Sequence, residues 1–143
     1  MKSFFPHSAS TRGVTVRVAP SFLPEQSEPG RGRWFWAYHV RIENEGPGEV
    51  QLVSRQWTIC DARGARSEVR GEGVVGEQPV IAPGGSFDYV SGCPLGTAAG
   101  WMEGRYLMVC ADGRAFAAEI PRFPLVAAAV SSVEPDSRRR KAK

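Results

Sequence analysis

Apolar and polar residues alternate with a period of two along most of the chain. The clearest case begins at Trp34, where every even position through Ile42 is apolar while His39 and Arg41 are polar. Such alternation is typical of a β-strand with one buried face. We find no long segment whose apolar residues recur with the period of a helix. The sequence therefore predicts a protein built almost entirely from strands.

About seven short strands are predicted, with Gly- and Pro-containing turns between them. They cover residues 14–18, 34–42, 49–60, 65–70, 87–89, 102–110 and 116–120. In the long segment 49–60 the apolar parity switches near Leu52, which predicts a β-bulge there. Short strands at this spacing favour a two-layer antiparallel β-sandwich of the fibronectin type III or immunoglobulin kind. A partly closed barrel is the alternative.

Length and composition set the domain limits. The chain has 143 residues, of which 42% are hydrophobic, and this suffices for one core of ordinary size. We expect a flexible N-terminus over 1–11, one β-sandwich domain over 12–127 and a disordered basic tail over 128–143. No run of residues approaches the roughly 18 consecutive apolar positions of a membrane-spanning helix. We therefore expect a soluble, cytoplasmic protein with no membrane insertion.

The charge is unevenly placed. The segment from Glu134 onward holds five of the eighteen basic residues and two of the fifteen acidic ones, so the rest carries thirteen of each. A neutral body gives no electrostatic case for binding nucleic acid, so we do not expect a nucleic-acid partner. The basic tail could touch an acidic partner, but such a run is more often a solvated end.

Residues suited to catalysis or metal binding are scarce. His39 is the one histidine outside the N-terminal segment, and every lysine lies near an end of the chain. The cysteines Cys60, Cys93 and Cys110 are odd in number and show no C-x-x-C spacing, so neither a disulfide framework nor a zinc site is expected. No pair of carboxylates is placed for acid–base chemistry. We expect no enzymatic activity, no cofactor and no metal centre.

A glycine motif lies between the fourth and fifth predicted strands. Residues 71–76 read G-x-G-x-x-G, the pattern that lets a pyrophosphate approach a helix N-terminus in dinucleotide-binding folds. Here Pro79 and Pro83 would lie inside the required helix, and interior prolines disrupt helices. We therefore expect a tight loop beside a strand edge. The alternative is a small anion-binding loop, whose candidate residues are Arg70, Gly71, Gly73 and Gly76.

A candidate interaction surface involves Trp101 and Arg105. They share a parity opposite to the apolar positions of segment 102–110, which predicts that both face away from the core. Trp and Arg are enriched at interface hot spots, although an isolated Trp at a strand start often belongs to a satellite of the core. An exposed edge strand would also permit a homodimer.

The strings VQLVSRQW at residues 50–57, EVRGEGVVGEQP at 68–79 and MEGRYLM at 102–108 resemble the bacterial ApaG family. The resemblance covers about residues 12–127, and its most specific part is the glycine-rich string with its trailing Gln-Pro. Val90 departs from the family pattern, where threonine is more usual, and so does the basic C-terminal extension. The matching strings span residues 50–57, 68–79, 81–84, 89–95 and 102–108.

The resemblance implies a fibronectin type III-like sandwich, in agreement with the strand pattern. It also implies a link to cobalt resistance and magnesium efflux, and related domains in eukaryotic F-box and polymerase-delta-interacting proteins are interaction modules. A chain without a spanning segment cannot itself be an efflux channel. Our leading hypothesis is a non-catalytic module that binds an unidentified protein partner in divalent-cation homeostasis. The alternatives are binding of phosphate or nucleotide at the glycine loop and direct binding of Co²⁺ or Mg²⁺.

Overall fold

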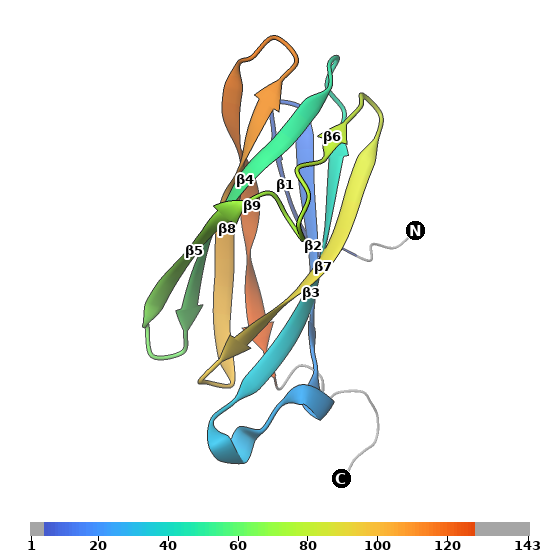
Figure 1. Cartoon of the computed structure of the whole chain (residues 1–143). Coiled ribbons are helices and arrows are strands. Elements are labelled where there is room, and N and C mark those ends of the chain that lie inside the picture. Colours follow the sequence, from blue (N-terminus) through green and yellow to red (C-terminus); the bar gives the residue numbers. More distant parts are fainter. Residues whose placement is uncertain (1–4, 128–143) are drawn as a thin grey trace.

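A computed structural model describes residues 5–127 of the chain. Nine strands and two short 3-10 helices make up this part (Figure 1). The elements are β1 (His7–Thr11), β2 (Val14–Phe22), η1 (Pro24–Gln26), η2 (Pro29–Arg31), β3 (Trp34–Asn44), β4 (Val50–Asp61), β5 (Arg66–Glu72), β6 (Val80–Ile81), β7 (Ser86–Leu95), β8 (Ala99–Cys110) and β9 (Ala115–Val126).

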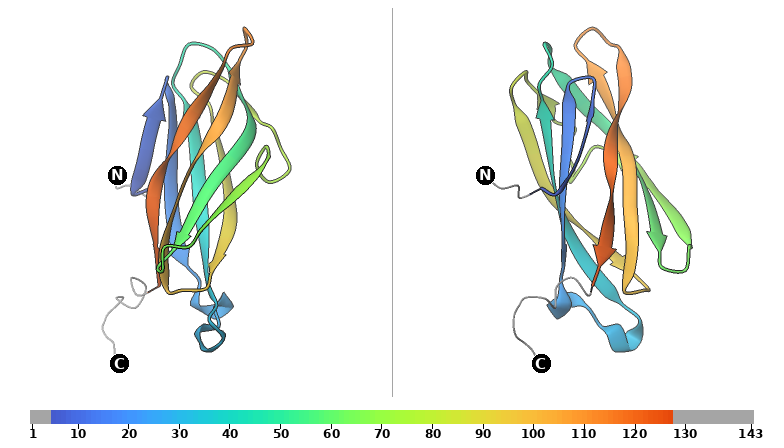
Figure 2. Two further views of the ribbon diagram at one scale, coloured as in Figure 1. Left: turned by 90° about the vertical axis from the view of Figure 1, so that its left-hand side faces the viewer. Right: turned by 180° about the vertical axis from the view of Figure 1, so that it is seen from behind.

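The strands form two antiparallel sheets that pack face to face. One sheet has the order β1-β2-β3-β7, and the other has the order β5-β4-β8-β9 with β6 attached to β4. Figure 1 and the right-hand view of Figure 2 show the two layers side by side. The predicted all-β, two-layer sandwich of the fibronectin type III or immunoglobulin kind is confirmed. The structure has nine strands where the sequence suggested about seven, because β1 and the two-residue β6 carry too little pattern to be recognised.

The N-terminal segment corrects one prediction. Residues 1–11 were expected to be flexible, but His7–Thr11 forms the edge strand β1 and pairs with β2 from His7↔Val18 to Thr11↔Val14. The turn between the strands uses positive φ angles at Arg12 and Gly13, as two-residue hairpin turns require. Strand β1 reads His-Ser-Ala-Ser-Thr and has no large apolar side chain, so it shows no hydrophobic alternation from which a strand could be predicted. The tail predicted over 128–143 lies outside the described residues.

The core lies between the inner faces of the two sheets. On β3 the even residues Trp36, Tyr38, Val40 and Ile42 are buried, as the alternation predicts. Trp57 of β4 packs edge-on against three other rings of the inner layer, with ring centroids 5.3 to 6.5 Å apart. These rings belong to Tyr38, Tyr106 and Phe123.

A β-bulge in β4 decides which residues face outward. The register between β4 and β8 shifts between Leu52 and Ser54, at the predicted position. Because side chains alternate between faces, one extra residue moves every later residue to the other side. Leu52 is therefore buried in the core, whereas Gln56 is on the outer face and Trp57 points inward. This switch creates the candidate site.

Candidate functional site

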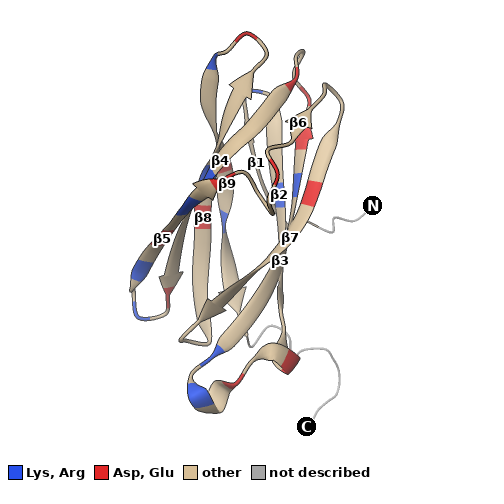
Figure 3. Cartoon of the chain, in the orientation of Figure 1, with Lys and Arg blue, Asp and Glu red and all other residues tan. Residues whose placement is uncertain are grey.

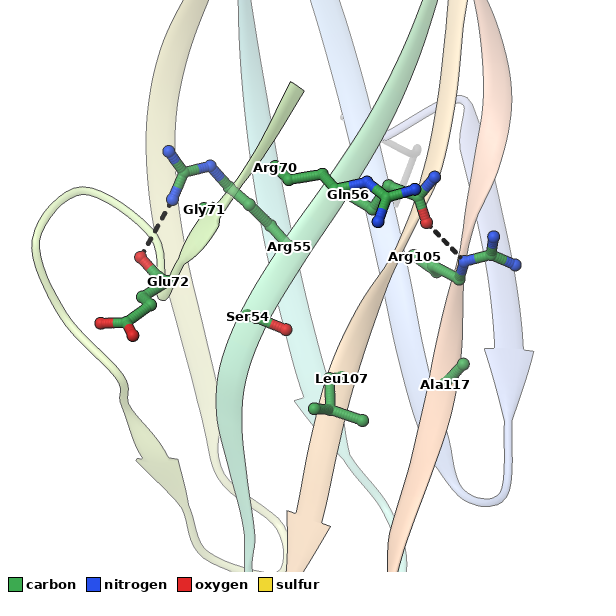
Figure 4. Close-up of a pocket in the computed structure, with 9 residues that line it drawn as sticks. All are labelled: Ser54, Arg55, Gln56, Arg70, Gly71, Glu72, Arg105, Leu107 and Ala117. Carbon is green, nitrogen blue, oxygen red and sulfur yellow. Dashed lines mark hydrogen bonds between the residues drawn. The ribbon is translucent and has the colours of Figure 1, made fainter. Parts of the chain in front are cut away.

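The candidate site is a shallow pocket on the outer face of the sheet β5-β4-β8-β9. In register across three strands, Arg70 of β5 lies beside Gln56 of β4, and Gln56 lies beside Arg105 of β8. Figure 4 shows Arg70 extending toward Gln56, and its dashed line marks the hydrogen bond between Arg105 Nε and Gln56. The pocket has a volume of about 470 Å³. Its walls are Ser54, Arg55, Gln56, Arg70, Gly71, Glu72, Arg105, Leu107 and Ala117.

The two arginines of the pocket, Arg70 and Arg105, each form only a weak or single interaction with other side chains in residues 5–127. Arg105 Nε donates a 2.8 Å hydrogen bond to Gln56 Oε1, and within residues 5–127 it joins no salt bridge. Arg70 contacts the Glu68 carboxylate at 3.4 Å, and both side chains are well exposed. Exposed pairs of this kind contribute little to stability. Both guanidinium groups therefore have donors to offer a ligand.

Arg55 serves the fold beside this pocket. Figure 4 shows it pointing away from Gln56, and its Nη1 donates to the backbone carbonyls of Glu72 at 3.0 Å and Gly73 at 2.7 Å. A Cβ atom at Gly71 would lie 2.7 Å from the Arg55 guanidinium. Gly71 is therefore needed for close packing under Arg55. No strand pattern reveals this contact, because it depends on the bulge.

Trp101 is half-buried on the predicted outer face, and it is not a wall of the pocket. Its indole is covered on one side by Arg122, with the guanidinium carbon 3.7 Å from the ring centroid, and Arg66 lies at 5.2 Å. Arg122 also forms a 2.9 Å salt bridge with Glu103. Trp101 and Arg105 thus share the outer face of β8 yet have separate neighbours. The structure joins Arg105 to Arg70 and Gly71, a grouping that sequence spacing did not suggest.

The glycine-rich segment is a hairpin turn. Val74 and Glu77 exchange backbone hydrogen bonds of 2.8 and 2.9 Å, while Val75 and Gly76 occupy positive φ angles between them. Gly73 donates its N–H to Val53, and a Cβ atom at Gly73 would lie 2.0 Å from the Glu77 carbonyl oxygen. The chain then enters β6 rather than a helix.

Two conclusions follow from this turn. The crossover helix of a dinucleotide-binding fold is replaced by a strand, as the two prolines indicated. The N–H groups of Gly73, Val74 and Glu77 donate within the protein, so they are not directed at an anion.

A second cleft lies beside this turn, between the two sheets. It has a volume of about 310 Å³, and its lining includes the polar side chains of Tyr38, Arg55 and Ser91 together with Gly76 of the turn. Burial raises the pKa of Tyr38. Deeper in the core, the hydroxyl groups of Tyr89 and Tyr106 form a hydrogen bond, and burial raises the pKa of both. These phenols are neutral at physiological pH.

The remaining polar groups show ordinary structural environments. The three cysteines are free thiols, and burial raises the pKa of Cys93 to about 11, so it is not a thiolate near neutrality. His39 contacts Asp88 at 3.3 Å on a half-exposed strand face. Across residues 5–127 no three His, Cys, Asp or Glu side chains cluster as metal ligands would. In the same range, none of the helices has the length and apolar content to cross a bilayer.

Fold and site together define a small β-sandwich domain with an arginine-flanked pocket on one outer sheet face. Residues 24–110 match the family model of the ApaG domain. The chain belongs to the ApaG family.

Relatives in sequence and structure agree. The chain is 56% identical to Protein ApaG of Methylobacterium sp. (strain 4-46) and 55% identical to that of Rhodospirillum centenum, in each case over 83% of this chain and 92% of the relative. A solved structure of a Bordetella pertussis protein described as ApaA superposes with a TM-score of 0.78 at 47% identity, covering 79% of this chain and 92% of that one. A structural genomics target at 36% identity gives the same TM-score over 90% of this chain and 97% of that one.

Proposed function

We propose that this protein is a non-catalytic binding module whose outer β5-β4-β8-β9 face recognises a carboxylate-bearing segment of a partner protein. The observation that carries the proposal is the row Arg70, Gln56, Arg105 across three adjacent strands. Arginine presents several donors in a plane and suits bidentate recognition of carboxylates. Gln56 already holds the Arg105 side chain in place through its amide oxygen.

The surroundings of the row support an interaction site. Leu107 on the pocket floor is 40% exposed, and Trp101 with its two arginine neighbours extends the same face. Partly exposed apolar and aromatic groups beside charged ones are typical of recognition surfaces. Figure 3 shows charges of both signs over both sheets, so selectivity would come from this local arrangement and not from overall charge.

Affinity capture from cell lysate tests the proposal. Three single substitutions are compared with the unaltered protein: Arg105→Ala, Trp101→Ala and Arg114→Ala. Arg114 is the matched control, because it is exposed at the β8–β9 turn and pairs only locally with Asp112. A true partner is retained by Arg114→Ala and lost from Arg105→Ala, with at least about tenfold weaker binding when the purified pair is measured. An unchanged set of captured proteins for Arg105→Ala would remove this face from consideration.

A cellular theme comes from the family resemblance. We place the module in divalent-cation homeostasis, the Co²⁺ and Mg²⁺ theme of the bacterial ApaG proteins, with the partner performing any transport. Three cysteines without a disulfide suit a cytoplasmic location, where thiols stay reduced. The alternative is that the protein itself binds Co²⁺ or Mg²⁺. Calorimetric titration with CoCl₂ and MgCl₂ tests it, and no heat at millimolar metal would end it.

Phosphate binding is a second candidate, favoured by the cleft beside the glycine turn. Arg55 lines this cleft and joins no salt bridge within residues 5–127, while Tyr38 and Ser91 add hydroxyl groups. The ligand would then contact side chains, since the N–H groups of Gly73, Val74 and Glu77 donate internally. Calorimetry with pyrophosphate, comparing the unaltered protein with Ser91→Ala, tests this reading. Equal or absent heats in the two proteins would contradict it.

A further inference from the structure

Strand β5 is an open sheet edge. Within the described part of the chain it pairs only with β4, and all its residues except Gly71 are exposed. Figures 1 and 2 show the β4–β5 hairpin projecting away from the other sheet. An exposed edge with unpaired N–H and C=O groups is a template for another strand. The question is which strand fits it.

The hydrogen bonds at the two ends of β5 show which groups point outward. Asp61 N–H donates to the carbonyl of Ala65, and Gly73 N–H donates to the carbonyl of Val53. Backbone groups alternate in direction along a strand, so the odd residues from 65 to 73 face β4. The even residues Arg66, Glu68, Arg70 and Glu72 therefore direct their N–H and C=O groups to the open edge.

The charges on those even residues are complementary to a second copy of the same strand. In an antiparallel pair centred on Val69, Glu68 lies opposite Arg70 of the other copy, and Arg66 lies opposite Glu72. Each pair occurs twice by symmetry. Opposite charges directly across an antiparallel pair are stabilising and like charges are destabilising.

Neighbouring registers lose this complementarity. Shifting the centre to Arg70 places the two Arg70 side chains opposite one another and Glu68 opposite Glu72. Shifting the centre to Glu68 places the two Glu68 side chains opposite one another and Arg66 opposite Arg70. If one copy alone shifts by one residue, its even residues lie opposite odd residues of the other copy. The N–H and C=O groups of those odd residues point toward β4, so the backbone hydrogen bonds between the copies cannot form. Centres at Ser67 or Gly71 keep the backbone match but form only one kind of opposite-charge pair, Arg66–Glu68 or Arg70–Glu72. The register centred on Val69 therefore forms the most opposite-charge pairs.

We propose that β5 is the interface of a symmetric homodimer, in which two copies pair antiparallel about Val69. This isologous contact doubles the strand path β5-β4-β8-β9 into one continuous sheet with about eight new backbone hydrogen bonds. Val69, 41% exposed in one copy, lies on the two-fold axis against its counterpart. In a pair centred on a residue whose own N–H faces β4, the two Val69 side chains approach closely.

The dimer does not rest on the proposed partner binding. Arg70 belongs to both surfaces, because the other copy's Glu68 would approach it, whereas Arg105 and Gln56 face solvent in either state. The Arg105→Ala variant should therefore dimerise normally.

A charge exchange tests the dimer. Sedimentation equilibrium of the full chain should give twice the 15.6 kDa mass at high concentration. Glu68→Arg and Arg70→Glu should each raise the dimer dissociation constant by roughly tenfold or more, since each creates two like-charge pairs. The double variant carrying both changes restores opposite charges in the same register and should recover the dimer. Circular dichroism of each variant separates loss of the dimer from loss of the fold.

A cysteine cross-link tests the register itself. Val69→Cys should form an intermolecular disulfide on mild oxidation, because close non-hydrogen-bonded pairs have suitable geometry. Val90→Cys is the matched control, since Val90 of β7 is 59% exposed and lies away from the proposed axis. The unaltered protein shows the contribution of its own thiols. A monomer at all concentrations, with Val69→Cys cross-linking no faster than Val90→Cys, would overturn the proposal.

Discussion

The two faces of the sheet β5-β4-β8-β9 have opposite characters, although the same strands supply both. On β8 the inward residues Met102, Tyr106 and Met108 are fully buried, while Arg105 and Leu107 on the outward side are exposed. The inward side packs rings and methionines, the Tyr106 hydroxyl bonds that of Tyr89, and Arg55 lines the cleft between the sheets. The outward side carries three arginines. Arg105 bonds the Gln56 amide, Arg122 lies over the Trp101 ring, and Arg70 forms a weak ion pair with Glu68.

This difference separates stability from recognition. Burial of large apolar side chains is the main source of folding free energy, so the inward face should dominate the free energy of unfolding. Exposed charged residues contribute little to that quantity. The row Arg70, Gln56, Arg105 is therefore available to bind a partner. Substitutions on the inward face should lower the unfolding free energy much more than substitutions in this row.

The largest effect is expected at Gly104 on the inward side. A Cβ atom there would lie 2.1 Å from the Gln56 carbonyl oxygen, so Gly104→Ala must push β8 away from β4. We expect a loss of about 3 kcal/mol or more of unfolding free energy, measured by urea denaturation. Gly30→Ala is the control, because no atom lies within 4 Å of a Cβ at Gly30. Similar losses of unfolding free energy in Gly104→Ala and Gly30→Ala would show that the close approach of β8 to β4 is not the cause.

The buried hydroxyl pair should give the next effect. Tyr106→Phe or Tyr89→Phe alone leaves one buried hydroxyl without its partner, at a cost of about 1–3 kcal/mol each. The double substitution removes both groups and should cost clearly less than the sum. Urea denaturation of the four proteins forms a double-mutant cycle. Additive losses would mean that the two hydroxyl groups do not depend on one another.

Alkaline pH should weaken the same inward region. Burial raises the pKa of Cys93 to about 11 and also raises the pKa of Tyr89 and Tyr106. Above pH 9 the unfolded chain therefore releases protons that the folded chain retains. The unfolding free energy should be unaffected by these groups below pH 9 and then fall by about 1.4 kcal/mol per pH unit for each group titrating. A denaturation series from pH 8 to 11 measures this, and Cys93→Ala should flatten its first part.

The smallest stability effect is expected on the outward side. Arg105→Ala removes one exposed hydrogen bond to Gln56 and should change the unfolding free energy by less than about 0.5 kcal/mol. The same urea titration measures it. A loss comparable with that of the tyrosine substitutions would show that the outer row supports the fold, and the contrast between the faces would fail.

Strong patterns made much of the fold predictable from sequence. The alternation of Trp36 to Ile42 set the inward face of β3, and the parity switch near Leu52 located the bulge. Strand β1 was missed because its polar residues carry no apolar period, and it is held by hairpin pairing with β2. The sequence predicted strands over 87–89 and 102–110, but β7 continues to Leu95 and β8 starts at Ala99.

The candidate site was predictable only in pieces. Arg70, Gly71 and Arg105 were each selected from sequence, but for two different surfaces, and the structure places them in one pocket. Gln56, which connects them, was missed because a single polar residue in a strand gives no signal until the register is known. The pairing of β4 with both β5 and β8 is a long-range property of the fold. Sequence spacing does not encode it.

The most direct measurement of the central claim is a nuclear magnetic resonance titration of the ¹⁵N-labelled protein with a hexaglutamate peptide at low salt. The account predicts saturable shifts of the Gln56 side-chain amide and the Arg105 Nε–H signal, and none with hexalysine. The side-chain amide of Asn44 is buried and bonded to the Gly48 and Ile81 carbonyls, so it serves as the internal reference. Unmoved Gln56 and Arg105 signals, or shifts confined to the β1-β2-β3-β7 sheet, would contradict the account.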